Sequence, residues 1–124
     1  MDQMNKRVDF IGVGVAKAGT SWITERLITH PQIYIPKIRN IGYFAENDIE
    51  GLTTYVQGPF ENYLNVFPEA QAGVVYGEYT PQYFIIMETL DRIKAVLPDV
   101  KLIISFREQV DMYQSYFNYM QSSI

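Results

Sequence analysis

The sequence contains no cysteine and only one histidine, His30, in its 124 residues. The lack of cysteine excludes disulfide bonds, thiolate nucleophiles and cysteine zinc sites. A single histidine likewise excludes a histidine metal cluster. We therefore expect no metal cofactor, and any chemistry must come from other side chains.

Long apolar runs and an excess of basic charge are also missing. No uninterrupted apolar run approaches the roughly 20 residues needed to cross a bilayer, so we expect no membrane span. The 10 Lys and Arg side chains are outnumbered by 14 Asp and Glu, which gives a formal net charge of −4. A duplex nucleic-acid binder normally displays a basic face, so this balance argues against a nucleic-acid partner. The net negative charge is still compatible with small anionic ligands, because a local binding site can carry positive charge.

The first ten residues carry neither an apolar stretch before Asp9 nor a small-residue cleavage site. They predict no secretory signal and, by default, a cytoplasmic protein. Apolar residues make up 48% of the chain, with 10 Tyr, 7 Phe and 1 Trp. This is enough apolar material to form one compact domain with its own core.

Short runs rich in Val and Ile alternate with amphipathic patterns along the chain. This alternation predicts an α/β fold with a parallel sheet flanked by helices on both faces. The expected strands cover 8–15, 33–35, 73–79 and 101–106. The expected helices run from Thr20 to near His30, over 60–67, over 86–97 and from Glu108 onwards.

The chain stops on a helix that follows what should be a central strand. Since 124 residues is also short for such a sheet with its ligand loops, we expect 1–124 to be a single, partial domain. An incompletely covered sheet needs companions, so a second copy or another chain is expected to complete the fold.

A glycine loop follows the first strand. The run GVGVAKAGTSW places Gly14 and Gly19 five apart, close to a phosphate-binding loop, although Thr20 stands where that loop has lysine. Glycines let backbone N–H groups curl around an anion, and the helix N-terminus adds a positive field. The alternative is a tight turn whose glycines only serve packing. Lys17 and the hydroxyls of Thr20 and Ser21 favour the anion site.

The segment KAGTSWI resembles the loop with which the sulfotransferase family grips the 5′-phosphosulfate of 3′-phosphoadenosine 5′-phosphosulfate (PAPS). The resemblance implies a phosphate-loop NTPase-like three-layer fold and PAPS as the sulfuryl donor. It also implies that Lys17 contacts the bridging and sulfonate oxygens and stabilises charge on the leaving phosphate. The donor phosphate would be held by Ala18, Gly19, Thr20, Ser21 and Trp22.

A second motif begins where the last expected strand ends. Arg107 stands at the carboxyl end of that strand and Ser115 lies eight residues on. Ligands of open α/β sheets bind at this edge, and arginine can grip a phosphate with two hydrogen bonds. Taken alone, the two residues are better explained as a solvated loop charge and an incidental helix-surface hydroxyl. The segment is similar to the family's 3′-phosphate motif R-x-P-x-x-R-x-x-S-x-[YF], except that Gln109 and Met112 replace the usual proline and second arginine.

Two middle segments also resemble the family. PKIRNIGYF, residues 36–44, is similar to K-E-[LIP]-[HG]-[YF]-F, whose glutamate is the proposed general base. Asn40 takes that position, and an amide can orient an acceptor but cannot remove its proton. The alternative is a plain loop with an aromatic anchor.

GEYTPQYF, residues 77–84, resembles G-E-[KS]-[ST]-P-x-Y, with Tyr79 where lysine is common. Glu78 is then either a salt-bridge or acceptor-binding group, or a structural one. His30 precedes Pro31 at a helix end, which favours a capping role over catalysis.

Together the four segments predict a sulfotransferase that moves a sulfuryl group from PAPS to a hydroxyl or amine of a small-molecule or carbohydrate acceptor. Two alternatives stay open. Asn40, Met112 and the short chain favour a non-catalytic remnant that keeps only nucleotide or anion binding. A nucleotide kinase-like phosphotransferase is less favoured, because Lys17 precedes Gly19 and no apolar strand ends in a magnesium-binding Asp.

Overall fold

The computed structural model describes residues 5–15, 20–37, 41–45 and 56–106. The described strands are β1 (Phe10–Gly14), β2 (Ile33–Tyr34), β3 (Val75–Tyr79) and β4 (Lys101–Ile104). The described helices are α1 (Thr20–Ile28), α2 (Phe60–Leu64), the 3₁₀ helix η2 (Pro81–Ile85) and α3 (Met87–Val96). The helix expected from Glu108 onwards lies outside the described residues.

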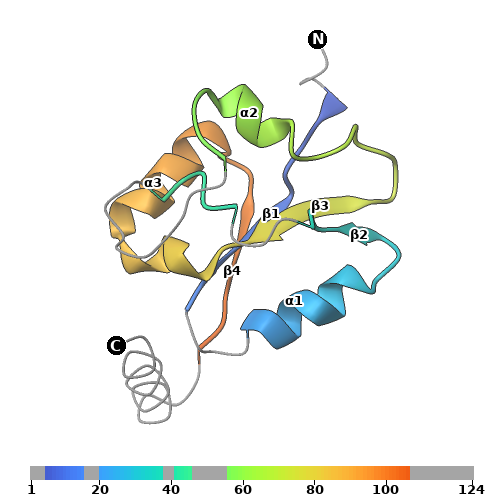
Figure 1. Ribbon diagram of the computed structural model, residues 1–124, viewed down its shortest axis with the longest axis horizontal. Helices are drawn as coiled ribbons and strands as arrows, with labels where there is room; N and C mark the ends of the chain where they lie inside the picture. The colour runs from blue at the N-terminus through green and yellow to red at the C-terminus, as the bar shows by residue number, and fades with distance from the viewer. Residues whose placement is uncertain (1–4, 16–19, 38–40, 46–55, 107–124) are drawn as a thin grey trace.

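The four strands form one parallel sheet in the order β2-β3-β1-β4. The step from β1 to β2 and the step from β3 to β4 run in opposite directions across the sheet. Right-handed crossovers therefore place α1 on one face and α2 and α3 on the other, and Figure 1 shows this arrangement. The predicted α/β fold with a parallel sheet between helices is confirmed.

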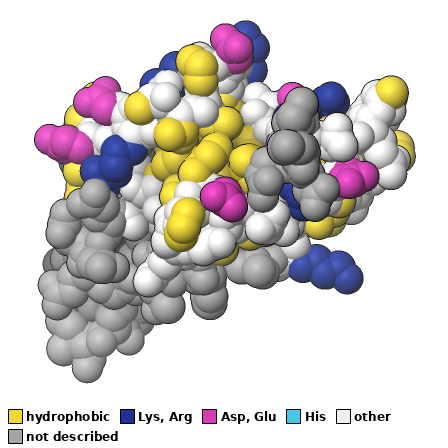
Figure 2. Space-filling model, turned by 90° about the horizontal axis from the view of Figure 1, so that it is seen from above, with side chains coloured by type: hydrophobic (Ala, Val, Ile, Leu, Met, Phe, Trp, Pro, Cys, Tyr) yellow, Lys and Arg dark blue, Asp and Glu magenta, His cyan; other side chains and the backbone are white. Residues whose placement is uncertain are grey.

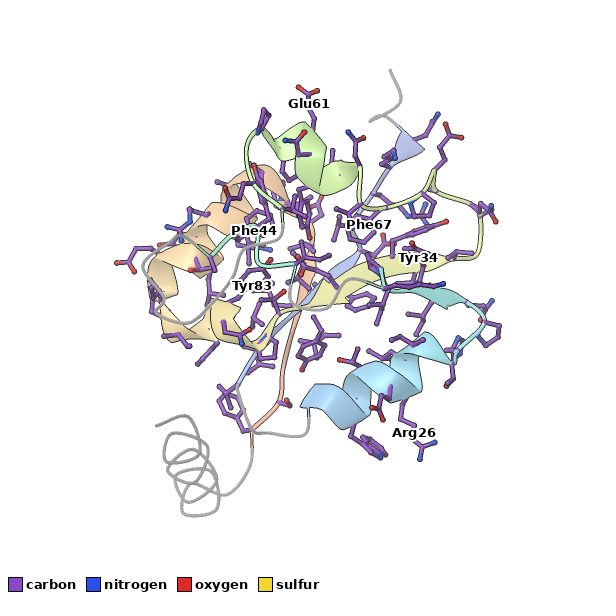
Figure 3. All side chains as sticks on the ribbon, viewed as in Figure 1. Arg26, Tyr34, Phe44, Glu61, Phe67 and Tyr83 are labelled. Carbon is purple, nitrogen blue, oxygen red and sulfur yellow. The ribbon has the colours of Figure 1, made fainter. Side chains whose placement is uncertain are left out.

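The aromatic core lies between the sheet and the pair α2 and α3. The Tyr63 ring of α2 is fully buried, with ring centroids 4.9 Å from Phe44 and 5.7 Å from Phe67. Phe44, Phe67 and Tyr83 all point into this layer (Figure 3). Burying each such side chain contributes about 1.5–3 kcal/mol, so this cluster fixes how α2 and the 41–45 segment sit on the sheet.

The opposite face of the sheet carries two glycine–aromatic pairs. Phe10 of β1 is opposite Gly77 of β3, and Gly12 of β1 is opposite Tyr79 of β3. A Cβ atom on either glycine would collide with the partner's ring. Each ring therefore lies across the neighbouring strand, and a slip of one residue would drive both rings into side chains.

The surface seen in Figure 2 shows apolar side chains near its centre, with acidic and basic side chains scattered around them. On this face the charges of the described residues do not gather into a patch of one sign.

Candidate functional site

The carboxyl edge of the sheet brings the ends of β1 and β4 together. The Val15 N–H donates to the Ser105 carbonyl at 2.9 Å, and the Ser105 N–H donates to the Gly14 carbonyl at 2.8 Å. Residues 16–19 follow Val15, and Arg107 follows Phe106. The two predicted anion-binding segments thus leave the sheet from neighbouring strands, at the edge where ligands of open α/β sheets bind.

Gly14, the last residue of β1, is required by its backbone and by its neighbours. Its φ is +143°, and a Cβ atom there would lie 2.7 Å from the Pro81 carbonyl oxygen and 3.0 Å from Cβ of Phe84. A side chain would be strained in that conformation and would push η2 away. The packing explanation for a loop glycine therefore holds at Gly14, and it does not compete with an anion site at the residues that follow.

The first turn of α1 begins at Thr20, as predicted, and contains no acidic residue. Figure 1 shows this helix start facing the edge at which β1 and β4 end. The unpaired N–H groups of a helix start attract an anion. The Trp22 side chain is 61% exposed, and the Arg26 guanidinium lies 5.3 Å from its ring centroid.

The other predicted site residues stay predictions. The side chains of Thr20 and Ser21 are not described. The remaining positions lie outside the described residues: Lys17, Ala18, Gly19, Asn40, Arg107 and Ser115.

Glu78 of β3 is buried in a cluster of hydroxyl groups. Its Oε2 accepts hydrogen bonds from Tyr63 at 2.7 Å and from Tyr83 at 2.9 Å, and its Oε1 accepts one from Thr80 at 2.7 Å. Burial raises the pKa of Glu78 above its usual value, and the three hydroxyl donors oppose that rise. Within the described part of the chain, Glu78 forms no ion pair. The structure therefore favours the structural explanation over the salt-bridge and acceptor-binding ones.

The two tyrosines of this cluster are held as neutral phenols. Burial, followed by the negative charge of Glu78, raises the pKa of Tyr63 and of Tyr83 well above 10. Neither tyrosine was predicted from the sequence as a partner of Glu78. The signal was a carboxylate inside an otherwise apolar strand, which must find donors once it is buried.

The segment 41–45 is anchored at the same edge. The Gly42 N–H donates to Thr80 Oγ1 at 3.4 Å, directly after β3. The Phe44 carbonyl accepts from Nε and Nη2 of Arg92 at 3.1 and 2.9 Å. Since the Phe44 ring is buried, the aromatic anchor of the plain-loop alternative is present, and residues 41–45 lie beside the end of β3.

Tyr79 occupies the position where the related motif commonly has lysine. Its buried ring crosses over Gly12, and its hydroxyl lies 3.4 Å from Ser105 Oγ on the far side of β1. This position therefore supplies a hydroxyl under the end of β1 and no positive charge.

His30 lies away from this edge, between the end of α1 and the start of β2. Its Nδ1 accepts a hydrogen bond from the Gln32 N–H at 3.1 Å, in the turn that leads from α1 into β2. This contact supports the turn, and the helix-capping role of His30 stays a prediction. No three His, Asp or Glu side chains in the described ranges are grouped so that they could hold a metal ion. Nor does any described helix have the length and apolar character to span a bilayer.

No family model matches the chain. Among curated proteins, the membrane-associated sulfotransferase kil1 of Dictyostelium discoideum is 32% identical over 90% of this chain and 22% of its own length. The human heparan sulfate glucosamine 3-O-sulfotransferase 6 is 34% identical over 79% of this chain and 26% of its own length. A crystal structure of a sulfotransferase from Alicyclobacillus acidocaldarius matches with a TM-score of 0.76 and 28% identity, covering 94% of this chain and 51% of the other.

These comparisons correct the predicted location of the protein and show how much of each relative the chain covers. The prediction of a cytoplasmic protein is wrong, because the relatives include a membrane-associated protein. The prediction rested on the composition of the first ten residues. Those residues carry no information on how relatives with much longer chains attach to a membrane. The chain spans about a quarter of the curated relatives it matches and about half of the matching structure.

Proposed function

This chain is a homologue of sulfotransferases, and we propose that it carries the donor-binding part of such an enzyme, which moves a sulfuryl group from PAPS to a hydroxyl or amine. The observation that carries the proposal is the backbone pairing of Val15 with Ser105. Because of this pairing, the two motifs proposed to bind anions begin at adjacent strand ends, beside the start of α1.

The spacing suits a donor with phosphates at both ends of one ribose. Neighbouring strands lie about 4.8 Å apart, so groups leaving β1 and β4 can reach the two ends of a single nucleotide. In this proposal Lys17 and the backbone of residues 18–22 hold the 5′-phosphosulfate, and Arg107 with Ser115 holds the 3′-phosphate. Lys17 stabilises the charge that develops on the leaving phosphate.

The acceptor side is formed by the segment that follows Asn40. Its anchoring by Thr80 and Arg92 brings residues 41–45 to the end of β3, next to the end of β1. Asn40 orients the acceptor through its amide and leaves proton removal to another group. The acceptor is a small molecule or a carbohydrate, as the names of the heparan sulfate relatives suggest for glycans.

The buried state of Glu78 favours this proposal over a kinase-like phosphotransferase. A phosphate-loop kinase needs an acidic side chain at a strand end to hold magnesium. Glu78 is the only acidic residue in the described strands, and hydroxyl groups of Tyr63, Thr80 and Tyr83 already occupy both of its oxygens inside the core.

Calorimetric titration of the full protein with 3′-phosphoadenosine 5′-phosphate (PAP), beside ATP with magnesium, tests the proposal. We expect PAP to bind at least tenfold more tightly. Tighter binding of ATP with magnesium would overturn the proposal. A transfer assay with labelled PAPS, using heparan sulfate and p-nitrophenol as acceptors, then separates an enzyme from a remnant that binds PAP without transferring sulfate.

A further inference from the structure

A series of hydrogen bonds runs from the buried Glu78 carboxylate through Thr80 to the backbone of Gly42. The Gly42 N–H donates to Thr80 Oγ1, and the Thr80 hydroxyl donates to Glu78 Oε1. Tyr63 and Tyr83 both donate to the other carboxylate oxygen. Among the described residues, the backbone group bound to Thr80 Oγ1 at the outer end of these hydrogen bonds is the Gly42 N–H, in the 41–45 segment.

The number of protons available fixes which group donates and which accepts in each of these hydrogen bonds. A hydroxyl has one proton to donate, whereas an ionised carboxylate only accepts. Because both tyrosines occupy Oε2, Oε1 is left for the proton of Thr80. Thr80 must then turn a lone pair outwards, where the Gly42 N–H meets it. The carboxylate thus decides which way the Thr80 hydroxyl points.

Stability alone does not account for this arrangement. Burying a carboxylate costs several kcal/mol before its hydrogen bonds offset the penalty, and apolar replacements of buried charges are often neutral or stabilising. A fully satisfied polar network instead fixes a unique geometry. The element whose geometry it fixes here is the backbone at Gly42, two residues after Asn40.

The far end of the same segment is held independently. Two nitrogen atoms of Arg92 donate to the Phe44 carbonyl, and the Tyr43 hydroxyl donates to the Gly58 carbonyl at 2.8 Å. At its Asn40 end the segment is held by the buried side chain of Ile41, and the Thr80 contact fixes the backbone N–H of the next residue, Gly42. Losing that contact would free the Gly42 N–H while Ile41 and Phe44 stay packed in the core.

We propose that Glu78 and Thr80 are positioning residues that hold the Gly42 backbone against the end of β3 and so set the acceptor side of the site. That this side of the site binds the acceptor rests on the proposed function. The attachment itself does not, so the two can fail separately.

Amide hydrogen exchange of the full protein tests the attachment. Thr80→Val keeps the shape and removes both hydrogen bonds, whereas Thr80→Ser keeps the hydroxyl. We expect about five- to tenfold faster exchange at Gly42 in Thr80→Val and near-normal exchange in Thr80→Ser, with the β1 amides unchanged in both. Unchanged exchange at Gly42, or equal acceleration throughout β1, overturns the proposal. If Thr80→Val does not fold, Thr80→Ala, which removes the same two hydrogen bonds, is interpreted in the same way.

Kinetics test the consequence for the acceptor. With heparan sulfate or p-nitrophenol as the probe, Thr80→Val should raise the acceptor KM several-fold and leave the Kd for PAP unchanged, and Thr80→Ser should restore the KM. An equal loss of PAP binding would mean that Thr80 acts on the whole fold and would overturn the proposal. If wild type neither binds PAP nor transfers sulfate, the proposed function fails, and exchange at Gly42 alone decides the positioning role.

Discussion

The ring of Tyr79 on β3 lies over Gly12 on β1, in the space that a Cβ atom at position 12 would fill. The missing side chain lets the ring cross the central strand, so the Tyr79 hydroxyl comes within 3.4 Å of Ser105 Oγ beside β4. Three strands are thus linked beneath the edge at which the two proposed anion-binding motifs begin. Position 12 therefore shapes the sheet directly beneath that edge.

Gly12→Ala should destabilise the fold by about 1–3 kcal/mol, because the added methyl group forces the Tyr79 ring out of its place. Urea denaturation measures the loss. In the double variant Gly12→Ala/Tyr79→Ala the collision is absent, so its free energy of unfolding should exceed the value expected from adding the two single losses. Simple additivity would show that the ring does not depend on the glycine.

The stability contribution of Glu78 should fall as pH rises. Burial raises its pKa in the folded state above the value of 4.5 taken for the unfolded chain, so the folded protein binds that proton more tightly. Below about pH 4.5 both states hold the proton. Between that pH and the raised pKa of the folded state, only the unfolded chain loses it, and stability decreases.

Glu78→Gln removes this proton and serves as the comparison. The difference in free energy of unfolding, wild type minus variant, should be largest in acid and should decline until Glu78 is ionised in the folded state. Chemical denaturation at a series of pH values measures it. A difference that grows with rising pH would mean that the hydroxyl donors outweigh the cost of burial.

The parts of the fold that follow from local patterns were predictable. Runs of Val and Ile gave β1 and β4, and the spacing of Ile23 and Leu27 gave α1. The parallel topology then placed the motif starts at one edge. The partners of Glu78 were not predictable, because Tyr63 lies on another element and only tertiary packing brings it close. The same holds for the ring of Tyr79 over Gly12, which no periodicity signals.

Lys17→Ala should weaken PAP binding by about tenfold and lower sulfuryl transfer by about 100-fold or more. The unequal losses follow because the lysine charge matters most when the leaving oxygen becomes negative. Calorimetry and a PAPS transfer assay give the two values. Lys101→Ala, at the opposite edge of the sheet, is the matched control and should change neither. Equal losses for Lys17→Ala would make it a binding residue only.

Arg107→Ala should remove most of the preference for nucleotides with a 3′-phosphate. Arg107 follows β4, whose end is paired with the end of β1, so its motif starts one strand away from the 5′-phosphate loop. A hydrogen bond from a charged donor contributes about 1.5–3 kcal/mol, so the ratio of PAP to adenosine 5′-phosphate affinities should fall by about tenfold or more. Adenosine 5′-phosphate itself should bind as before, because it lacks the group that Arg107 would hold. Competition binding measures both affinities, and Lys101→Ala again serves as the control, since it removes a positive charge from the same strand at its other end. An unchanged ratio in Arg107→Ala would place the 3′-phosphate elsewhere, and the two motifs would then not share one nucleotide.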